Sequence, residues 1–385
     1  MMALVPLLAQ LAAADLPTGR VIEKVPCRAG EPHSYALYLP SAYTPERTWP
    51  ILYCLDPGAR GRIPVERFRG AAESYGWILV GSNASRNGPW QPNVAAFKAL
   101  WEDAQLRFSI DSRRIYAAGF SGGARVAAAL AAAMPEISGV IGCGAGFPGP
   151  VPKTVSFAWF GAAGVDDFNY IDVRQVQVAV AATGQAARFV VFDEAHNWPP
   201  EPVCTAAVEW LEVQAMKTGR RPRDPALVKT LLEKRRGAMA AVEAGLASSE
   251  YGALAADFGG LAEVAAYEKE AERLQSSRER KAYLKREADL EKRQQSLHED
   301  LAALIQDQDL SAFRASVGDL AKKASSPADS PDRRVARRVL SGQYIGLIEQ
   351  SRALSGPTQQ DQRRLLEDAI AVLRPALSWW VRRLT

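Results

Sequence analysis

The sequence predicts an α/β domain with a mostly parallel sheet, followed by an all-helical domain. Three observations predict this fold class. From residue 21 to about residue 219, short β-rich apolar runs alternate with amphipathic stretches of helical period, which is typical of a sheet covered on both faces. After residues 220–225 the β-rich runs end, and Ala, Leu, Glu, Lys, Arg and Gln dominate. With 385 residues, the chain is also too long for one ordinary core.

These changes divide the chain into three parts. Residues 21–222 are expected to form the α/β domain and residues 223–385 the helical domain. Residues 1–20 contain an apolar run that ends in three alanines, as a secretory signal peptide would. Export to the periplasm or the medium is therefore expected. The run lacks a basic n-region, so a plain apolar helix in a cytoplasmic protein is the alternative, and it is too short to span a bilayer of about 30 Å.

Composition excludes several classes of protein. Hydrophobic residues make up 48% of the chain and charged residues 23%, which argues against wholesale disorder or a fibrous repeat. With 47 basic and 43 acidic residues, the net charge of +4 predicts no nucleic-acid partner. The four cysteines form no C-x-x-C pair and have no histidine beside them, so a zinc site is not expected.

The α/β part is expected to contain eight strands connected by short loops and helices. The strand runs begin at Val21, His33, Pro50, Trp77, Arg113, Ser138, Val155 and Ala187. The helical stretches cover residues 64–76, 93–109, 122–135, 170–184 and 200–219. Connections this short leave little room for a large lid domain.

The helical part shows one long charged stretch. Residues 267–304 are dense in both signs of charge and carry leucines at helical spacing, which predicts a long solvated helix with one packed stripe (Leu290, Leu297, Leu301 and Leu304). Residues 325–331 are a loop by composition, and two helices are expected beyond it. Such a domain could recruit a protein partner or mediate self-association.

The strongest chemical motif is Gly119-Phe120-Ser121-Gly122-Gly123. It follows an apolar strand and opens an Ala-rich helix, which is the context that a nucleophile elbow requires. Glycines on either side let strand and helix approach without clashing side chains, while the turn exposes the serine hydroxyl at the carboxyl edge of the sheet. The alternative is a glycine-rich turn without chemistry, because short patterns recur by accident.

A serine hydroxyl needs a base at neutral pH, and the chain has three histidines. His33 begins an early strand and His298 lies in the charged helical region. His196 follows the strand that starts at Ala187 and would reach the same sheet edge as Ser121. It is therefore the candidate base, against the alternative of a solvent-exposed loop histidine.

The third member of a triad should be a carboxylate that follows a strand between these two residues. Asp166 and Asp167 follow the run that starts at Val155, which gives the chain order Ser, Asp, His. An aspartate that accepts the far N–H of the histidine fixes its tautomer and stabilises the imidazolium. We expect Asp167 in this role, with Asp166 as the alternative acid or as a residue that caps the loop.

Two backbone N–H groups would have to stabilise the oxyanion. One is expected from Gly122, the residue after the nucleophile, and the other from Gly58 or Ala59 in the loop after the third strand. The alternative for that loop is a bare turn.

Three further residues are expected to line the substrate site. Asn87 and Trp90 follow the fourth strand, and Trp198 lies two residues after the candidate base. Aromatic rings at loop positions also serve local packing, so packing is the alternative for both tryptophans.

Together these residues resemble those of the bacterial α/β-hydrolases, the superfamily of esterase-like and polyhydroxybutyrate-depolymerase-like serine esterases. The resemblance is carried by Asp-Pro-Gly-Ala-Arg-Gly at 56–61, the elbow at 119–123, Asp-Phe-Asn-Tyr at 167–170 and His-Asn-Trp-Pro-Pro at 196–200. It covers about the first 200 residues and none of the helical domain. It implies a three-layer α/β-hydrolase fold and ester hydrolysis by Ser121, Asp167 and His196. In this group the carboxylate usually stands directly before the Phe-Asn-Tyr-like segment, which favours Asp167, although the doubled aspartate leaves the choice open.

The predicted activity is therefore hydrolysis of a small or polymeric carboxylic ester through an acyl-enzyme. The loop at 56–61 lacks the His-Gly-Gly form of many lipases, and no lid is evident, so an esterase is favoured over a long-chain lipase. A serine peptidase would use the same triad and is the first alternative. The second is an inert hydrolase-fold scaffold whose helical half binds a partner.

Overall fold

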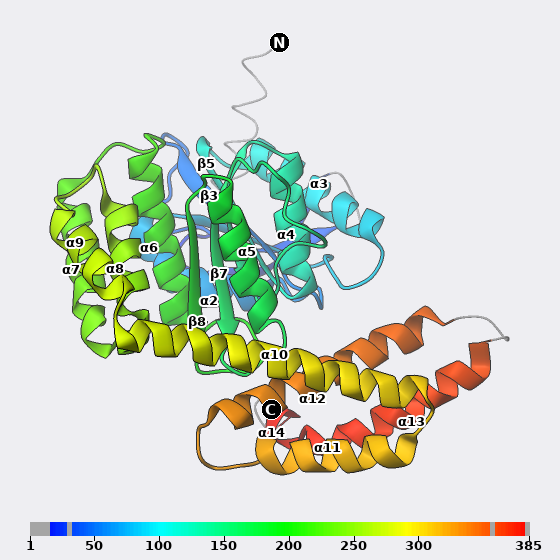
Figure 1. Ribbon diagram of the computed structural model, residues 1–385. Helices are drawn as coiled ribbons and strands as arrows, with labels where there is room; N and C mark the ends of the chain where they lie inside the picture. The colour runs from blue at the N-terminus through cyan, green and yellow to red at the C-terminus, as the bar shows by residue number, and fades with distance from the viewer. Residues whose placement is uncertain (1–15, 29–32, 355–358, 382–385) are drawn as a thin grey trace. The chain divides into compact units, whose positions relative to one another are not determined.

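The computed structural model describes residues 16–28, 33–354 and 359–381 (Figure 1). Most of the expected signal segment lies outside the described residues. Within them the chain forms two compact units. The first contains residues up to 163 together with 172–192 and 197–276, and the second contains residues 164–171, 193–196 and those from 277 onward.

The first unit is built on an eight-stranded sheet with the order β1-β2-β4-β3-β5-β6-β7-β8. Its strands are β1 Val21–Pro26, β2 Ser34–Tyr38, β3 Trp49–Leu55, β4 Ile78–Ser82, β5 Ile110–Phe120, β6 Ile137–Cys143, β7 Ala158–Gly164 and β8 Ala187–Phe192. β2 pairs antiparallel with β1 and β4, whereas β3 pairs parallel with β4 and β5, and β6 pairs parallel with β5 and β7. This topology, with flanking helices and a sharp turn after β5, confirms the predicted α/β-hydrolase fold class.

Helices cover both faces of this sheet, as the alternating sequence pattern predicts (Figure 1). One face carries α2 Arg62–Tyr75 and α6 Glu201–Lys217, and the other carries α3 Trp90–Arg107, α4 Gly122–Ala133 and α5 Tyr170–Ala182. β3 is buried along its whole length. Tyr53 and Leu55 join the core under α3 and α4, and Leu52 and Cys54 join the core under α2 and α6, because successive side chains of a strand point to opposite faces.

Three more helices complete the first unit. They are α7 Pro225–Ala238, α8 Ala244–Phe258 and α9 Ala265–Gln275, with a 3₁₀ turn at Met239–Ala241. Val213 and Met216 of α6 form a core with Val228 of α7 and Phe258 of α8. The all-helical part of the chain begins after residue 222, as the sequence indicates, but its first three helices belong to the first unit. The domain boundary at residue 222 stays a prediction.

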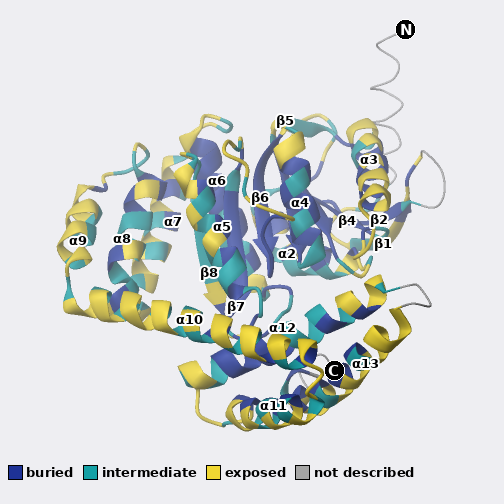
Figure 2. Cartoon of the chain, turned by 45° about the vertical axis from the view of Figure 1, so that its right-hand side comes forward, coloured by how far each residue is buried: buried dark blue, intermediate teal, exposed yellow. Residues whose placement is uncertain are grey.

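The second unit contains five helices within its described residues: α10 Arg278–Gln306, α11 Leu310–Ala324, α12 Pro331–Ala353, α13 Gln360–Ala376 and α14 Ser378–Val381. The leucine stripe of α10 packs as expected, with Leu301 buried and Leu290, Leu297 and Leu304 against the same core. Figure 2 shows that most residues of α9 and α10 are exposed or half-buried.

The expected single helix over residues 267–304 is wrong in one respect, because the structure divides it into α9 and α10. The division falls at Ser276-Ser277, where the side chain of Ser277 accepts a hydrogen bond from the N–H of Arg280 at 3.1 Å and caps α10. The expected loop at 325–331 separates α11 from α12, and Ser330 caps α12 in the same way.

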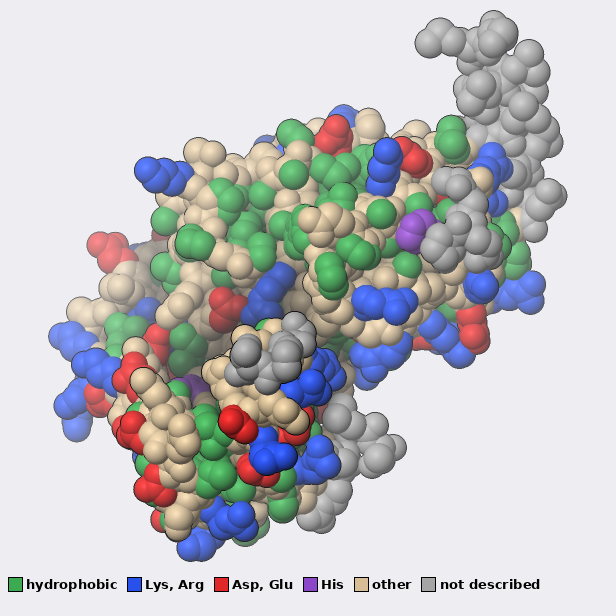
Figure 3. All heavy atoms as spheres, turned by 90° about the vertical axis from the view of Figure 1, so that its right-hand side faces the viewer, with side chains coloured by type: hydrophobic (Ala, Val, Ile, Leu, Met, Phe, Trp, Pro, Cys, Tyr) green, Lys and Arg blue, Asp and Glu red, His purple; other side chains and the backbone are tan. Residues whose placement is uncertain are grey.

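All four cysteines are buried free thiols. Burial raises the pKa of Cys27 to about 11 and raises the pKa of Cys54 well above its usual range, so neither thiol is ionised near neutral pH. No helix in the described part of the chain is long and apolar enough to cross a membrane. Basic and acidic side chains are intermixed on the face shown in Figure 3.

Candidate active site

Ser121 occupies a strained turn between β5 and α4. Its backbone has φ 52° and ψ −123°, a conformation that L-residues rarely adopt. The N–H of Ser121 donates to the carbonyl of Cys143 at the end of β6 at 2.8 Å, and the carbonyl of Ser121 accepts from the N–H of Ala124 at 3.0 Å as α4 begins. The turn is thus held from both sides. Strain that the surrounding structure enforces in this way is typical of a nucleophile elbow.

Glycines permit this turn by close approach of backbones. A Cβ added at Gly119 would lie 2.1 Å from the carbonyl oxygen of Gly123, and one added at Gly123 would lie 2.0 Å from the carbonyl oxygen of Leu55. Both distances are far below van der Waals contact. The steric reason that the sequence suggested for these two glycines is therefore present at both positions.

The loop after β3 is organised by the buried carboxylate of Asp56. The N–H of Gly58 donates to Asp56 Oδ1 at 2.8 Å, and the N–H of Ala59 donates to the carbonyl of Asp56 at 3.2 Å. Ala59 also has a positive φ of 59°. Both expected oxyanion donors are therefore engaged within their own loop, and each would have to release or share its hydrogen bond to serve a substrate.

Asn87 lies against the start of α4. The N–H of Asn87 donates to the carbonyl of Pro57 at 2.8 Å, and Arg86 pairs with Gly58 in an isolated β-bridge, so the loops after β3 and β4 support each other. Asn87 Oδ1 lies only 1.9 Å from the position that a Cβ on Gly122 would take. The carboxamide thus borders the residue after the predicted nucleophile. Trp90 begins α3 and is 40% exposed.

Trp198 packs inside the first unit. It is 2% exposed, its ring N–H donates to Asp56 Oδ2 at 2.8 Å, and its ring packs against Phe68 and Phe120. These contacts connect the segment after His196 to the loop after β3. They are the contacts of a packing residue, and a role in the substrate pocket stays a prediction.

The second unit brings Asp167 and His196 together. Asp167 follows β7 and His196 follows β8, and His196 Nδ1 lies 2.9 Å from Asp167 Oδ1. The Asp167 side chain is 0% exposed and that of His196 is 10% exposed. The same Asp167 oxygen accepts from the N–H of Asn169 at 2.8 Å, which fixes the carboxylate from within its loop. A buried aspartate on Nδ1 leaves Nε2 as the nitrogen that can exchange protons with a substrate or nucleophile.

The neighbouring carboxylate has a different partner. Asp166 Oδ2 accepts from Arg337 Nη1 of α12 at 2.7 Å, across 171 residues of sequence. Both side chains are buried, with exposures of 1% and 10%. No reasoning from the sequence pointed to Arg337. The only local signal was a pair of Arg-Arg dipeptides at helical spacing, at 333–334 and 337–338, and nothing in that pattern names Asp166 as its partner.

Phe168 packs directly on the histidine. The two ring centroids are 4.1 Å apart. Phe168 is the first residue of the Phe-Asn-Tyr segment after Asp167, so the residue beside the acid also packs against the base. Its sequence position gave no sign of this contact.

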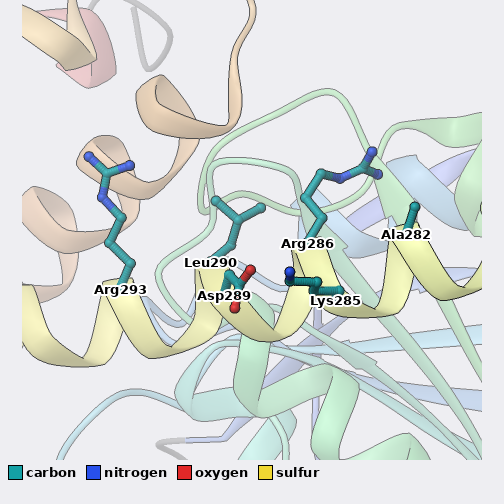
Figure 4. A pocket seen from close by; sticks show the side chains of 6 residues that line it. All are labelled: Ala282, Lys285, Arg286, Asp289, Leu290 and Arg293. Atoms are coloured by element: carbon teal, nitrogen blue, oxygen red, sulfur yellow. The ribbon is translucent and has the colours of Figure 1, made fainter.

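A separate shallow hollow lies along α10 (Figure 4). Its lining side chains all belong to that helix: Ala282, Lys285, Arg286, Asp289, Leu290 and Arg293. None of the predicted catalytic residues is among them. A surface hollow made by one helix lacks the converging polar groups of an enzyme site.

No family model matches the sequence, and no curated protein matches it. Solved structures that match include esterases and serine hydrolases. A ferulic acid esterase is 18% identical, with 49% of this chain and 94% of that chain covered and a TM-score of 0.40. A hyperthermophilic esterase from Pyrobaculum calidifontis is 14% identical, with coverages of 56% and 88% and a TM-score of 0.42. FphF, a fluorophosphonate-binding serine hydrolase from Staphylococcus aureus, is 12% identical, with coverages of 51% and 99% and a TM-score of 0.42. Values this low assign neither a family nor an activity.

Proposed function

We propose that this chain is a serine hydrolase that cleaves carboxylic esters through an acyl-enzyme, with Ser121 as nucleophile, His196 as base and Asp167 as acid. The hydrogen bond between Asp167 Oδ1 and His196 Nδ1, at 2.9 Å, carries this proposal. It joins two residues that follow β7 and β8 of the sheet whose β5 ends in the Ser121 turn. The strained conformation of Ser121 supports the role of nucleophile.

In the proposed reaction, His196 takes the proton of the Ser121 hydroxyl as the oxygen attacks the ester carbonyl. The tetrahedral intermediate collapses, the C–O bond to the alcohol breaks, and His196 returns the proton to the departing alcohol. Water then attacks the acyl-enzyme with the same proton transfers, which releases the acid and restores Ser121. Asp167 keeps the imidazole in the required tautomer and stabilises its protonated form. Neither a metal nor an organic cofactor takes part in these steps.

For the oxyanion, we propose the N–H of Gly122, at the N-terminus of α4, as one donor. The N–H of Gly58 or Ala59 remains the proposed second donor. Each of these N–H groups donates to Asp56, so this hydrogen bond would have to be released or shared when the oxyanion forms. Asn87 and Trp90 are proposed to contact the substrate, and the contact of the Asn87 carboxamide with Gly122 supports its part in this.

A fluorophosphonate probe tests the proposal directly, because it reacts covalently with an activated serine. The wild type should be labelled at Ser121, as located by peptide mass spectrometry, and Ser121→Ala should not be labelled. An unlabelled but folded wild type would instead favour an inert scaffold. Turnover of short acyl esters compared with peptide amides of the same acyl group then separates an esterase from a peptidase, because both would label.

A further inference from the structure

One face of α12 contacts the loop that carries the predicted acid. Arg337 Nη1 binds Asp166 Oδ2 at 2.7 Å, and one residue further along the helix Arg338 Nε donates to the carbonyl of Val165 at 2.7 Å. The Arg338 guanidinium also lies over the ring of Tyr170, 3.7 Å from its centroid. α12 therefore contacts the loop of residues 164–171 on both sides of Asp167.

Arg337 is itself fixed by groups of the second unit. Its Nε donates to the carbonyl of Ala324 at the end of α11 at 2.9 Å, and its guanidinium lies 4.7 Å from the ring of Trp379. A guanidinium that is held on two sides presents a rigid donor to the carboxylate. Asp166 is thus bound to an anchored group rather than to a flexible side chain.

The same helix also confines Phe168, which packs on the candidate base. A Cβ added at Gly342 of α12 would lie 3.2 Å from the Cβ of Phe168 and 3.0 Å from His298 Cε1. Phe168 packs against Trp380 on another side, with ring centroids 6.3 Å apart. Ala195, which precedes His196, belongs to the apolar core of this unit. Both the acid and the base are therefore flanked by residues that are packed into the helical core.

We propose that α12 positions the acid and base for catalysis, with Arg337 as the main positioning residue. The inference rests on the proposed function, since it explains how Asp167 and His196 are kept in register. Asp167 is covalently next to Asp166, so the ion pair of Asp166 with Arg337 limits how far the Asp167 carboxylate can move. Catalytic geometry tolerates displacements of only about 0.5 Å. α12 then supports the proposed catalytic residues directly, rather than forming part of an appendage for a partner.

The test compares Arg337→Met with Arg363→Met. Arg363 also forms an ion pair within the second unit, with its Nε 3.0 Å from Glu367 Oε1. Unlike the buried pair of Arg337 and Asp166, the side chains of Arg363 and Glu367 are each 55% exposed. Three measurements are needed: kcat and KM for p-nitrophenyl butyrate, the rate of fluorophosphonate labelling, and hydrogen–deuterium exchange of peptides that cover residues 164–171 and 193–196.

Arg337→Met should lower kcat and the labelling rate by roughly 10- to 100-fold, because small displacements of catalytic groups cost this much. KM should change by less than about threefold, because ground-state binding is not affected. Exchange in both loops should become faster. Arg337→Lys should recover part of kcat, since it restores a cation but not the planar donor fork. Arg363→Met should match the wild type in all three measurements.

The proposal is overturned if folded Arg337→Met keeps the wild-type kcat and the wild-type exchange in both loops. If Arg337→Met does not fold, the double variant Asp166→Asn/Arg337→Met replaces it, because it removes both buried charges together. Wild-type kcat and exchange in that double variant would likewise overturn the proposal. If the wild type is not labelled and does not hydrolyse esters, the proposed function is wrong independently of this inference. Hydrogen–deuterium exchange of residues 164–171 and 193–196 in Arg337→Met then still tests whether α12 holds the two loops.

Discussion

The turn at Ser121 and the pair of Asp167 with His196 are fixed by different kinds of interaction. The turn is defined by glycines within two residues of the serine and by the backbones of β3 and β6 beside it. The loop that carries Asp167 is held by contacts that cross 171 and 173 residues of sequence to α12. The proposed nucleophile elbow can therefore be recognised from five consecutive residues. The support of the proposed acid and base lies in a helix that carries none of the proposed catalytic residues.

Loss of the base should have the largest effect on activity. His196→Ala is expected to reduce kcat by about 10⁴- to 10⁶-fold, because triad members act as a unit. Steady-state ester hydrolysis measures this, with Ser121→Ala as the reference for complete loss. His33→Ala is the control histidine, because His33 directly precedes β2 in the first unit and is not proposed to act in catalysis. Near-wild-type turnover in His196→Ala would remove His196 from the mechanism.

The two adjacent aspartates provide a sharper comparison. Asp167→Asn should lower kcat by about 10⁴-fold, because an amide at that position can hold the imidazole in the wrong tautomer. Asp166→Asn removes the charge opposite Arg337 but keeps the shape, so we expect a loss of only about tenfold through displacement of the loop. The measurement is kcat for each variant at saturating ester. Equal activity of the two variants would refute the assignment of the acid.

Features that depend on residues close together in the sequence could be predicted, whereas features that depend on contacts between distant residues could not. The eight strands, the elbow and the leucine stripe of α10 follow patterns of period 2 or 3.6 or a short motif, and these were predictable. The break before α10 was visible as Ser277, a cap residue, but the surrounding run of charges suggested one continuous helix. The role of Arg337 was not predictable, because an ion pair between residues 171 apart leaves no periodic signal. The engaged N–H groups of Gly58 and Ala59 likewise depend on how Asp56 folds its own loop.

The elbow should be intolerant of even one added carbon. Gly123→Ala places a Cβ 2.0 Å from the backbone oxygen of Leu55, so β3 or α4 has to move. We expect the free energy of unfolding to fall by about 3 kcal/mol, the cost of strong overpacking. Gly237→Ala is the matched control, because its Cβ would meet nothing within 4 Å in α7. Alanine there should raise stability by roughly 0.5–1 kcal/mol through helix propensity. Urea unfolding of both variants checks the contrast.

The smallest expected effect concerns Asn87, whose side chain lies beside Gly122 in the first unit. Asn87→Ala should lower kcat/KM by about fivefold if its carboxamide makes one neutral hydrogen bond to the substrate, worth about 1 kcal/mol. A loss of about 10² to 10³ in kcat would instead assign it to the oxyanion, because donors there act mainly in the transition state. Steady-state kinetics of ester hydrolysis by Asn87→Ala therefore separates the two roles by the size of the loss in kcat. Wild-type kcat and KM in that variant would remove Asn87 from the proposed substrate site.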